Sequence, residues 1–262
     1  MKGFAGLPPQ TATQVVDITN WAAHEDFPVF PVGSKPKRML VCPVNASEPF
    51  LIPGHSYLFK TALGWQSQQV WSEVIAYRLG AMLGLPVPPC FIAMDRGTGL
   101  AGALVEFFYG YPDEAEPARF VHASDFMTRI LVDKKRGRPH SLHTNLQLSR
   151  LLCKGASAVA WWAEALAFDV LIGNTDRHPD NWGFLFRTRA GRTHSVEMSP
   201  FFDNGTSLGY EIAENKLTDA SSPDRLQKYV DRGTHHCGWD GDGSCVSICS
   251  GPRKRLETAC KV

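Results

Sequence analysis

The stretch Leu171-Ile-Gly-Asn-Thr-Asp-Arg-His-Pro-Asp-Asn-Trp182 decides the fold of this chain. It starts where a long apolar segment ends, and it runs through a loop rich in amide and ionisable side chains. Such groups are costly to hold beside a hydrophobic core unless partners or a function compensate for the lost water. The alternative is a simple helix end, in which Asn174 or Asp176 caps the helix and His178 is an ordinary surface group.

A second motif follows in Pro200-Phe-Phe-Asp-Asn-Gly205, where an apolar approach leads to Asp203 and a glycine two residues later. In the first motif, Asp176 and Asn181 stand five residues apart, and Asp203 comes 22 residues after Asn181. Each pattern is weak alone, since Asn-Gly is also a common hairpin turn. In this order, and joined by a predicted hairpin, the two motifs favour phosphoryl transfer.

Phosphoryl transfer needs carboxylate and amide oxygens like those of these two motifs. The transferred group carries spread negative charge, so catalysis consists mostly of positioning and electrostatics. One carboxylate must face the attacking hydroxyl, and another must hold Mg²⁺, which prefers oxygen ligands and needs only one or two carboxylates. An amide oxygen can complete the metal shell without adding negative charge. Protein kinases have an Asp–Asn pair with five-residue spacing followed by Asp-x-Gly, and this chain has both in that order.

Lys60 and Glu73 are two further candidate catalytic residues, and they lie in the first half of the chain. A kinase needs a lysine on a strand to grip the α- and β-phosphates, and a glutamate from the next helix to orient that lysine. Lys60 lies near the end of an expected strand, and Glu73 follows 13 residues later as the only acid of an expected helix. The alternative is a surface lysine and a surface glutamate.

The spacing of apolar and turn residues predicts an α+β fold. We expect a bilobal protein-kinase-like fold, with a small mixed β-sheet lobe that has one helix and a mainly helical C-terminal lobe. The expected strands are 27–32, 39–42, 57–61, 86–94, 101–108, 182–187 and 193–198, and the expected helices are 66–83, 123–134, 156–172 and 220–233. The helix 156–172 is apolar nearly all round, which predicts that it is buried.

Four parts are expected along the chain. They are an N-terminal extension (1–27), an ATP-binding lobe (28–109), a catalytic lobe (110–232) and a poorly ordered tail (233–262). The boundary between the lobes falls in Gly110–Pro117, which carries two prolines and three acids. The tail contains His235, His236 and several cysteines, but their spacing matches no standard zinc pattern.

The composition argues against several classes of protein. The 262 residues have a formal net charge of +1, so no strong field favours nucleic acid or a membrane surface. The N-terminus lacks the apolar region of a signal peptide, and no apolar run reaches the roughly 18 residues that a spanning helix needs. Seven scattered cysteines do not indicate a secreted disulfide scaffold. We therefore expect a cytoplasmic protein without direct nucleic-acid binding or membrane association.

The motifs together resemble the HipA-type serine/threonine kinases, specifically the HipA-like C-terminal domain. The resemblance runs in order over about residues 30 to 210. The matching segments are Gly33–Leu40, Tyr57–Lys60, Trp71–Ala76, Gly84–Pro88, Ile172–Asn181 and Phe202–Gly205. The resemblance implies an atypical kinase fold, ATP as the phosphate donor and Mg²⁺ as the metal.

The resemblance also implies roles by motif position. Asp176 would be the catalytic aspartate, and Asn181 and Asp203 would be metal ligands. Lys60 would hold the phosphates, and Glu73 would orient Lys60. The implied nucleotide-binding residues are Gly33, Ser34, Lys35 and Lys37 in place of a glycine-rich loop, Glu106, Phe107 and Phe108 at the adenine hinge, His178, and again Lys60, Asn181 and Asp203.

The chain departs from the usual kinase pattern in its phosphate loop. The G-x-G-x-x-G motif is absent, and Gly33 is the only glycine of the loop. HipA-type kinases also lack a conventional glycine-rich loop. Members of the family can autophosphorylate a serine in this loop, so Ser34 is a candidate for the same modification.

Three hypotheses for the function stay open. The first is a protein kinase of the HipA type, which phosphorylates a serine or threonine of a protein substrate and has an antitoxin partner. The second is a small-molecule or lipid kinase of the same fold, because type II phosphoinositide 4-kinases carry a similar Asn-x-Asp-Arg loop. The third is a pseudokinase used as a binding module. A pseudokinase would lack a key residue, and Lys60, Asp176, Asn181 and Asp203 are all present.

Overall fold

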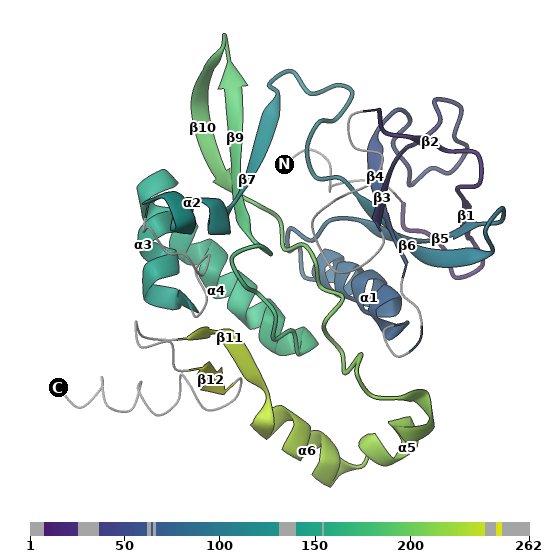
Figure 1. The fold of residues 1–262 in the computed structure, drawn as a ribbon, viewed down its shortest axis with the longest axis vertical. Coiled ribbons are helices and arrows are strands. Elements are labelled where there is room, and N and C mark those ends of the chain that lie inside the picture. The colour runs from purple at the N-terminus through teal and green to yellow at the C-terminus, as the bar shows by residue number, and fades with distance from the viewer. Residues whose placement is uncertain are drawn as a thin grey trace. The chain divides into compact units, whose positions relative to one another are not determined.

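The computed structural model describes residues 8–25, 37–61, 64, 67–130, 140–153, 155–238 and 245–247. The chain divides into two compact units, Met1–Ala118 and Arg119–Val262, and Figure 1 labels most of their elements. The expected strand 27–32 lies outside the described residues, as do Gly33, Ser34 and Lys35.

The first unit is a six-stranded sheet with one long helix. Its strands lie in the order β1-β5-β6-β4-β3-β2, and the helix α1 contacts β5 and β6 (Figure 1). The elements are β1 (Val16–Asp17), β2 (Ala22–Ala23), β3 (Lys37–Val41), β4 (Ser56–Lys60), α1 (Gln68–Met82), β5 (Cys90–Asp95) and β6 (Leu100–Glu106). These bounds confirm the strands expected at 39–42, 57–61 and 101–108 and the helix expected at 66–83, whereas the strand expected at 86–94 begins four residues late, at Cys90.

The alternation of side chains along β4 decides which residues face α1. Tyr57 and Phe59 are 0% and 1% exposed and belong to the main hydrophobic cluster of the sheet. Leu58 points to the opposite face, where it packs with Val70 and Val74 of α1 in a second cluster. Because successive side chains of a strand alternate between faces, Lys60 shares the α1 face with Leu58.

The second unit is built from helices and two small sheets. The sheets have the strand orders β10-β9-β7 and β12-β11-β8, and α3 packs against α4 (Figure 1). The elements are β7 (Ala118–His122), α2 (Ala123–Ile130), β8 (His140–Ser141), α3 (Leu142–Leu152), α4 (Gly155–Ile172), β9 (Gly183–Arg189), β10 (Arg192–Met198), a 3₁₀ turn (Glu214–Lys216), α5 (Leu217–Ala220), α6 (Pro223–Arg232), β11 (Thr234–Gly238) and β12 (Cys245–Ser247). The expected hairpin and the helix at 156–172 are confirmed, and the last expected helix begins three residues late, at Pro223.

The prediction that the helix 156–172 is buried is correct for one face only. One face of α4 is buried, with Trp161, Trp162 and Phe168 in the core, whereas Val159 and Leu171 are 42% and 57% exposed. Among the described residues, α4 is the one helix whose length and apolar composition would allow it to cross a membrane. Its buried face also carries an ion-paired aspartate, which is the pattern of a helix in a protein core.

The segment 233–262 was expected to be poorly ordered, and part of it is instead regular structure. Thr234–Gly238 forms β11, which pairs with β12 and, in parallel, with β8. His235 and Cys237 are 6% and 4% exposed, whereas His236 between them is exposed. The polar groups of this strand can be buried because other residues of the second unit satisfy their hydrogen bonds. The sequence of this strand has no apolar periodicity from which it could be predicted.

Candidate active site

In the first unit, Lys60 and Glu73 form a close ion pair. The distance from Lys60 Nζ to Glu73 Oε1 is 2.6 Å, and the side chains are 12% and 7% exposed. Glu73 lies on the buried face of α1, together with Gln69, Ala76 and Gly80, which recur at three- and four-residue spacing. The structure therefore brings together the two residues of this unit that the sequence analysis paired.

Lys37 lies directly across from Lys60 in the antiparallel pair of β3 and β4. Residues opposite one another in such a pair place their side chains on the same face, with Cβ atoms about 5 Å apart. Both lysines are partly buried. The α1 face of the sheet therefore carries two lysine side chains next to each other.

The predicted adenine segment Glu106–Phe108 follows the end of β6. The N–H of Glu106 donates to the carbonyl of Pro89, and the N–H of Phe107 donates to the carbonyl of Ser56. The carbonyl of Phe107 accepts a hydrogen bond from Nε2 of His55, at 2.6 Å. Two of the three N–H groups therefore already have partners in the sheet, and adenine binding by this segment stays a prediction.

The side chain of Glu106 points into the protein and is 1% exposed. Burial raises the pKa of its carboxyl to about 7, although a hydrogen bond from the Tyr111 hydroxyl, at 2.9 Å, works in the opposite direction. A carboxyl with this pKa is partly protonated at neutral pH. The sequence analysis considered only the backbone of this residue.

In the second unit, the loop after α4 is held by a fully buried ion pair between Asp169 and Arg177. Arg177 Nη2 lies 2.6 Å from Oδ1 of Asp169, and Nε donates to Oδ2 at 3.1 Å. Both side chains are 0% exposed. Burial alone raises the pKa of Asp169, but the Arg177 charge and the hydrogen bonds from His235 and Arg177 outweigh it, so the pKa lies below its ordinary value.

Arg177 also connects the two sequence motifs. Its Nη1 donates to the carbonyl of Asn181 in the loop, at 3.3 Å, and to the carbonyl of Phe202 at 2.7 Å. Its Nη2 donates to Oδ1 of Asn204, at 2.8 Å. One planar guanidinium group therefore sets the distance between the loop around Asp176 and the segment around Asp203.

The side chain of Asp176 is 31% exposed and has two histidines nearby. Nε2 of His178 lies 3.6 Å from Oδ1 of Asp176, and Nδ1 of His236 lies 3.8 Å from the same oxygen. The backbone N–H of Asp176 donates to Oδ1 of Asn174, and its carbonyl accepts a hydrogen bond from Nδ2 of Asn181 at 2.7 Å. The loop thus holds Asp176 by its backbone while its carboxylate stays accessible.

Asp203 has a left-handed backbone, with φ of +59°. Such a conformation is uncommon for a residue other than glycine, and it is often found at functional sites. The next residue stabilises it, because Nδ2 of Asn204 donates to the carbonyl of Phe201 at 2.7 Å while Oδ1 accepts from Arg177. The backbone of Asp203 is therefore shaped by hydrogen bonds on both sides.

Aromatic side chains fix both motifs to the core. Trp182, directly after Asn181, is 0% exposed and lies edge-on to Trp162 of α4, with ring centroids 4.8 Å apart. Phe201, before Asp203, is also 0% exposed and contacts Trp161 edge-on at 5.2 Å. Both motifs are thus anchored on the buried face of α4.

The residues proposed for metal binding, Asp203 and Asn181, would offer oxygen ligands. Within the described ranges, no group of three or more His, Cys, Asp and Glu side chains could hold a metal ion. Mg²⁺ needs only one or two carboxylates together with water and substrate phosphates. The amide nitrogen of Asn181 is already bonded to the Asp176 carbonyl, so its oxygen is the atom that could contact a metal beside Asp203.

Sequence reasoning missed three residues that support this site: Asp169, Asn204 and His235. The one available signal for Asp169 was its charge within an otherwise apolar helix, because a charge on a buried face requires a partner. Nε2 of His235 lies 3.2 Å from Oδ2 of Asp169, which joins β11 to the site. No spacing in the sequence indicates that contact.

A family model described as the HipA-like C-terminal domain matches residues 33–242. The chain belongs to the HipA-like C-terminal domain family. The match includes every described site residue from Lys37 to Asp203 and continues through β11. The strand that carries His235 is therefore part of the HipA-like C-terminal domain. Membership in this family supports a kinase-type phosphotransferase.

Similarities to individual proteins agree with the HipA-like assignment. The crystal structure of the Helicobacter pylori proinflammatory kinase CtkA is similar with a TM-score of 0.70, over 89% of this chain and 75% of that chain, at 19% identity. This similarity shows a kinase-like fold. A protein of Sinorhizobium fredii named Putative kinase Y4mE is 24% identical over 151 residues, which is 56% of this chain and 34% of that protein. The chain thus spans about a third of the length of this curated relative.

A further solved structure contains HipA of Shewanella oneidensis MR-1 with HipB and operator DNA. Its TM-score is 0.43 at 19% identity, over 76% of this chain and 52% of that chain.

Proposed function

We propose that this HipA-like domain transfers the γ-phosphate of ATP, with Mg²⁺, to a serine or threonine hydroxyl of another protein. The observation that carries the proposal is the 2.6 Å ion pair between Lys60 and Glu73, with both side chains largely buried. In protein kinases, a strand lysine held by a helix glutamate is the group that grips the α- and β-phosphates.

The first unit would supply the positive charge for the phosphates. Lys60 and Lys37 lie opposite each other on one face of the sheet. Two ammonium groups on one face can contact the oxygens of neighbouring phosphate groups. Their placement therefore supports a polyphosphate ligand such as ATP.

The second unit would supply the group that faces the acceptor. Asp176 is held by its backbone, and its carboxylate is 31% exposed. A carboxylate in this state can accept the proton of an approaching hydroxyl and orient the hydroxyl oxygen for attack.

The metal site of this proposal consists of Asp203 and the amide oxygen of Asn181. Bound Mg²⁺ would supply positive charge that neutralises the phosphate oxygens. Arg177 would keep the two ligands in register, because it donates to the carbonyl of Asn181 and to that of Phe202 next to Asp203. The left-handed backbone of Asp203 would aim its carboxylate.

The choice of a protein acceptor rests on the resemblance to HipA-type serine/threonine kinases. The same resemblance is the ground for proposing an antitoxin partner, which would be a second protein that binds this chain without being phosphorylated. It is also the ground for proposing autophosphorylation of Ser34, which lies outside the described residues.

The test is incubation of the purified chain with γ-labelled ATP and Mg²⁺, with a protein extract and a lipid extract as separate acceptors. Wild type and Glu164→Gln, which removes an exposed acid of α4 outside the site, should label protein serine or threonine. Asp203→Ala and Lys60→Met should not. Labelling confined to the lipid fraction would support a lipid kinase instead. ATP binding without phosphate transfer by wild type would indicate a pseudokinase.

A further inference from the structure

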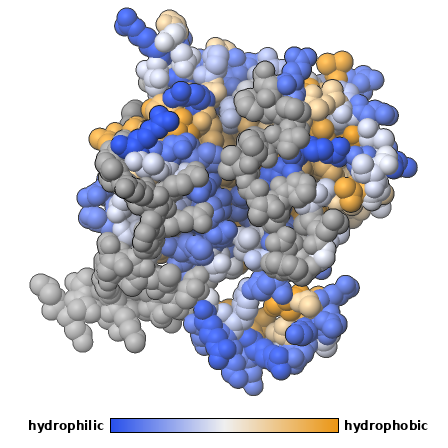
Figure 2. Space-filling view, viewed as in Figure 1, coloured by the Kyte–Doolittle hydropathy of each residue, from blue (hydrophilic) through white to orange (hydrophobic). Residues whose placement is uncertain are grey.

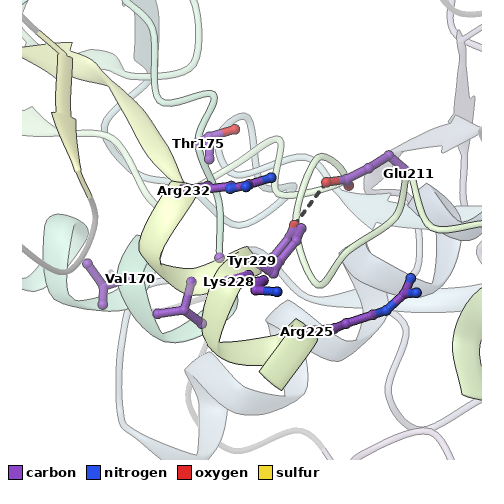
Figure 3. Close-up of a pocket in the computed structure, with 10 residues that line it drawn as sticks. Val170, Thr175, Glu211, Arg225, Lys228, Tyr229 and Arg232 are labelled. Atoms are coloured by element: carbon purple, nitrogen blue, oxygen red, sulfur yellow. Dashed lines mark hydrogen bonds between the residues drawn. The ribbon is translucent and has the colours of Figure 1, made fainter. Parts of the chain in front are cut away.

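A cavity of about 670 Å³ lies in the second unit, beside the loop that carries Asp176. One wall is the end of α4 and the start of the loop, including Gly173 and Thr175, and the other wall is α6 (Figure 3). Its volume is within the range of ligand-binding pockets in proteins, about 300–1,000 Å³. None of the site residues proposed above lines it.

The cavity wall formed by α6 is basic. Arg225, Lys228 and Arg232 all line the cavity, and their three- and four-residue spacing places them on one face of the helix. Figure 3 shows their side chains projecting from α6 toward the same side. With a rise of 1.5 Å per residue, the row of positive charges is about 10 Å long.

The helix α6 itself carries Asp224 and Asp231, which do not line the cavity, and two further carboxylates lie near the basic row. Glu211 is the one acid among the residues that line the cavity, and its Oε1 accepts a hydrogen bond from the Tyr229 hydroxyl, at 3.0 Å. Asp219 pairs with Arg225 at 2.6 Å, but both side chains are more than half exposed, so the pair is weak. In Figure 2, the α5–α6 region at the bottom of the view has a mostly hydrophilic surface with a small apolar patch.

A backbone hydrogen bond joins the loop to the strand that follows α6. Thr175, which lines the cavity, directly precedes Asp176, and its carbonyl accepts a hydrogen bond from the N–H of His236 at 3.0 Å. His236 belongs to β11, which begins two residues after α6 ends. A ligand in the cavity would therefore lie next to the residue that faces the acceptor hydroxyl.

We propose that this cavity, which we call the α6 pocket, binds an acidic segment of the protein substrate in an extended conformation. The proposal rests on the proposed function, in which Asp176 faces the acceptor hydroxyl. An extended chain rises about 3.3 Å per residue, and alternate side chains point the same way. Acidic residues at alternate positions would thus recur about every 7 Å, and three or four substrate residues would span the basic row. A single phosphate group would be too short to meet all three cations.

The binding test uses the full chain and a pair of labelled serine peptides. One peptide has Asp or Glu at alternate positions, and the other has Asn or Gln in their place. The charge-reversal variant carries Lys228→Glu and Arg232→Glu, and the matched control is Arg192→Glu, an exposed arginine of β10 away from the pocket. Fluorescence anisotropy measures peptide binding without any phosphate transfer. If charge reversal impairs folding, the variant with Lys228→Gln and Arg232→Gln is used in its place.

We expect wild type and Arg192→Glu to bind the acidic peptide equally and to prefer it over the neutral one. Loss of two surface charge pairs should weaken binding about tenfold in the α6 variants. Asp203→Ala should bind the acidic peptide as wild type does, because binding does not require phosphate transfer. If wild type binds the acidic peptide but transfers no phosphate, only the proposed function is contradicted. Equal binding of the two peptides, an equal effect of Arg192→Glu, or charge-dependent binding only to phosphoinositide vesicles would overturn the α6 pocket proposal.

Discussion

Nε2 of His235 lies 3.2 Å from Oδ2 of Asp169, which joins strand β11 to helix α4 across 66 positions of sequence. The N–H of Cys237 donates to Nδ1 of the same imidazole, at 3.0 Å. Nδ1 is therefore an acceptor, and Nε2 carries the proton that is donated to Asp169. Since Asp169 also binds Arg177, β11 supports the loop that carries Asp176.

We predict that His235→Ala destabilises the protein by about 1–3 kcal/mol, because a buried carboxylate oxygen loses a donor. The kcat for phosphate transfer should fall more than the affinity for ATP changes, because Asp176 and not the phosphate-binding pair is affected. Urea unfolding and steady-state kinetics measure the two effects. His235→Gln, whose amide can donate in place of Nε2, should recover part of both. Replacing the exposed His143 by alanine is the control, and equal effects at the two positions would contradict the role of His235.

Arg177→Met should be the most disruptive substitution in the loop. It leaves the carboxylate of Asp169 buried without its cation, and breaking a buried pair in this way costs about 3–5 kcal/mol. Adding Asp169→Leu should recover part of this loss, because no uncompensated charge then remains. Denaturant midpoints of the single and double variants test the expectation. A double variant less stable than Arg177→Met alone would show that the ion pair is not the cause.

The stability of the first unit should depend on pH through Glu106. The pKa of Glu106 is about 7 in the folded protein, against an ordinary value of 4.5. The folded state therefore holds a proton that the unfolded state has lost, and stability should decrease as the pH rises from 4.5 to 7. The decrease is of the order of 3 kcal/mol.

Glu106→Gln should remove this dependence and should be more stable than wild type at pH 8, since the amide oxygen still accepts the Tyr111 hydrogen bond. Thermal unfolding between pH 4.5 and 8 measures the slope for each variant. Asp113→Asn, which changes an exposed acid in the segment after β6, should keep the slope of wild type. A wild-type slope in Glu106→Gln would rule out Glu106 as its source.

Lys37→Ala should weaken ATP binding about tenfold. The reason is that Lys37 lies opposite Lys60, so both ammonium groups can contact the phosphate oxygens of one nucleotide. Calorimetric titration with Mg²⁺ and ATP measures the affinity, and unfolding of the ligand-free chain measures any change in stability. Arg96→Ala, at an exposed site of the same unit, is the control. A loss of stability without loss of affinity would contradict a phosphate-binding role.

Two elements of the second unit had no clear signal in the sequence. The helix α3 buries Asn145, Leu148 and Ser149, so two of its three buried positions are polar and its apolar spacing is hidden. Strand β11 likewise buries a histidine and a cysteine. Prediction of a helix or strand from sequence relies on apolar periodicity. These two elements are instead stabilised by hydrogen bonds to distant residues.

The sequence by itself determined the residue types and their local spacing: a strand lysine followed by a helix glutamate, an Asp–Asn pair five residues apart, and an Asp-x-Gly after a hairpin. These features are readable because helix and strand periods place nearby residues on known faces. Only the tertiary structure decided that Asp169, Arg177 and His235 form one buried network under the loop. A buried polar group must find its partner in space, wherever the chain brings that partner, and for this carboxylate one partner lies 66 residues away.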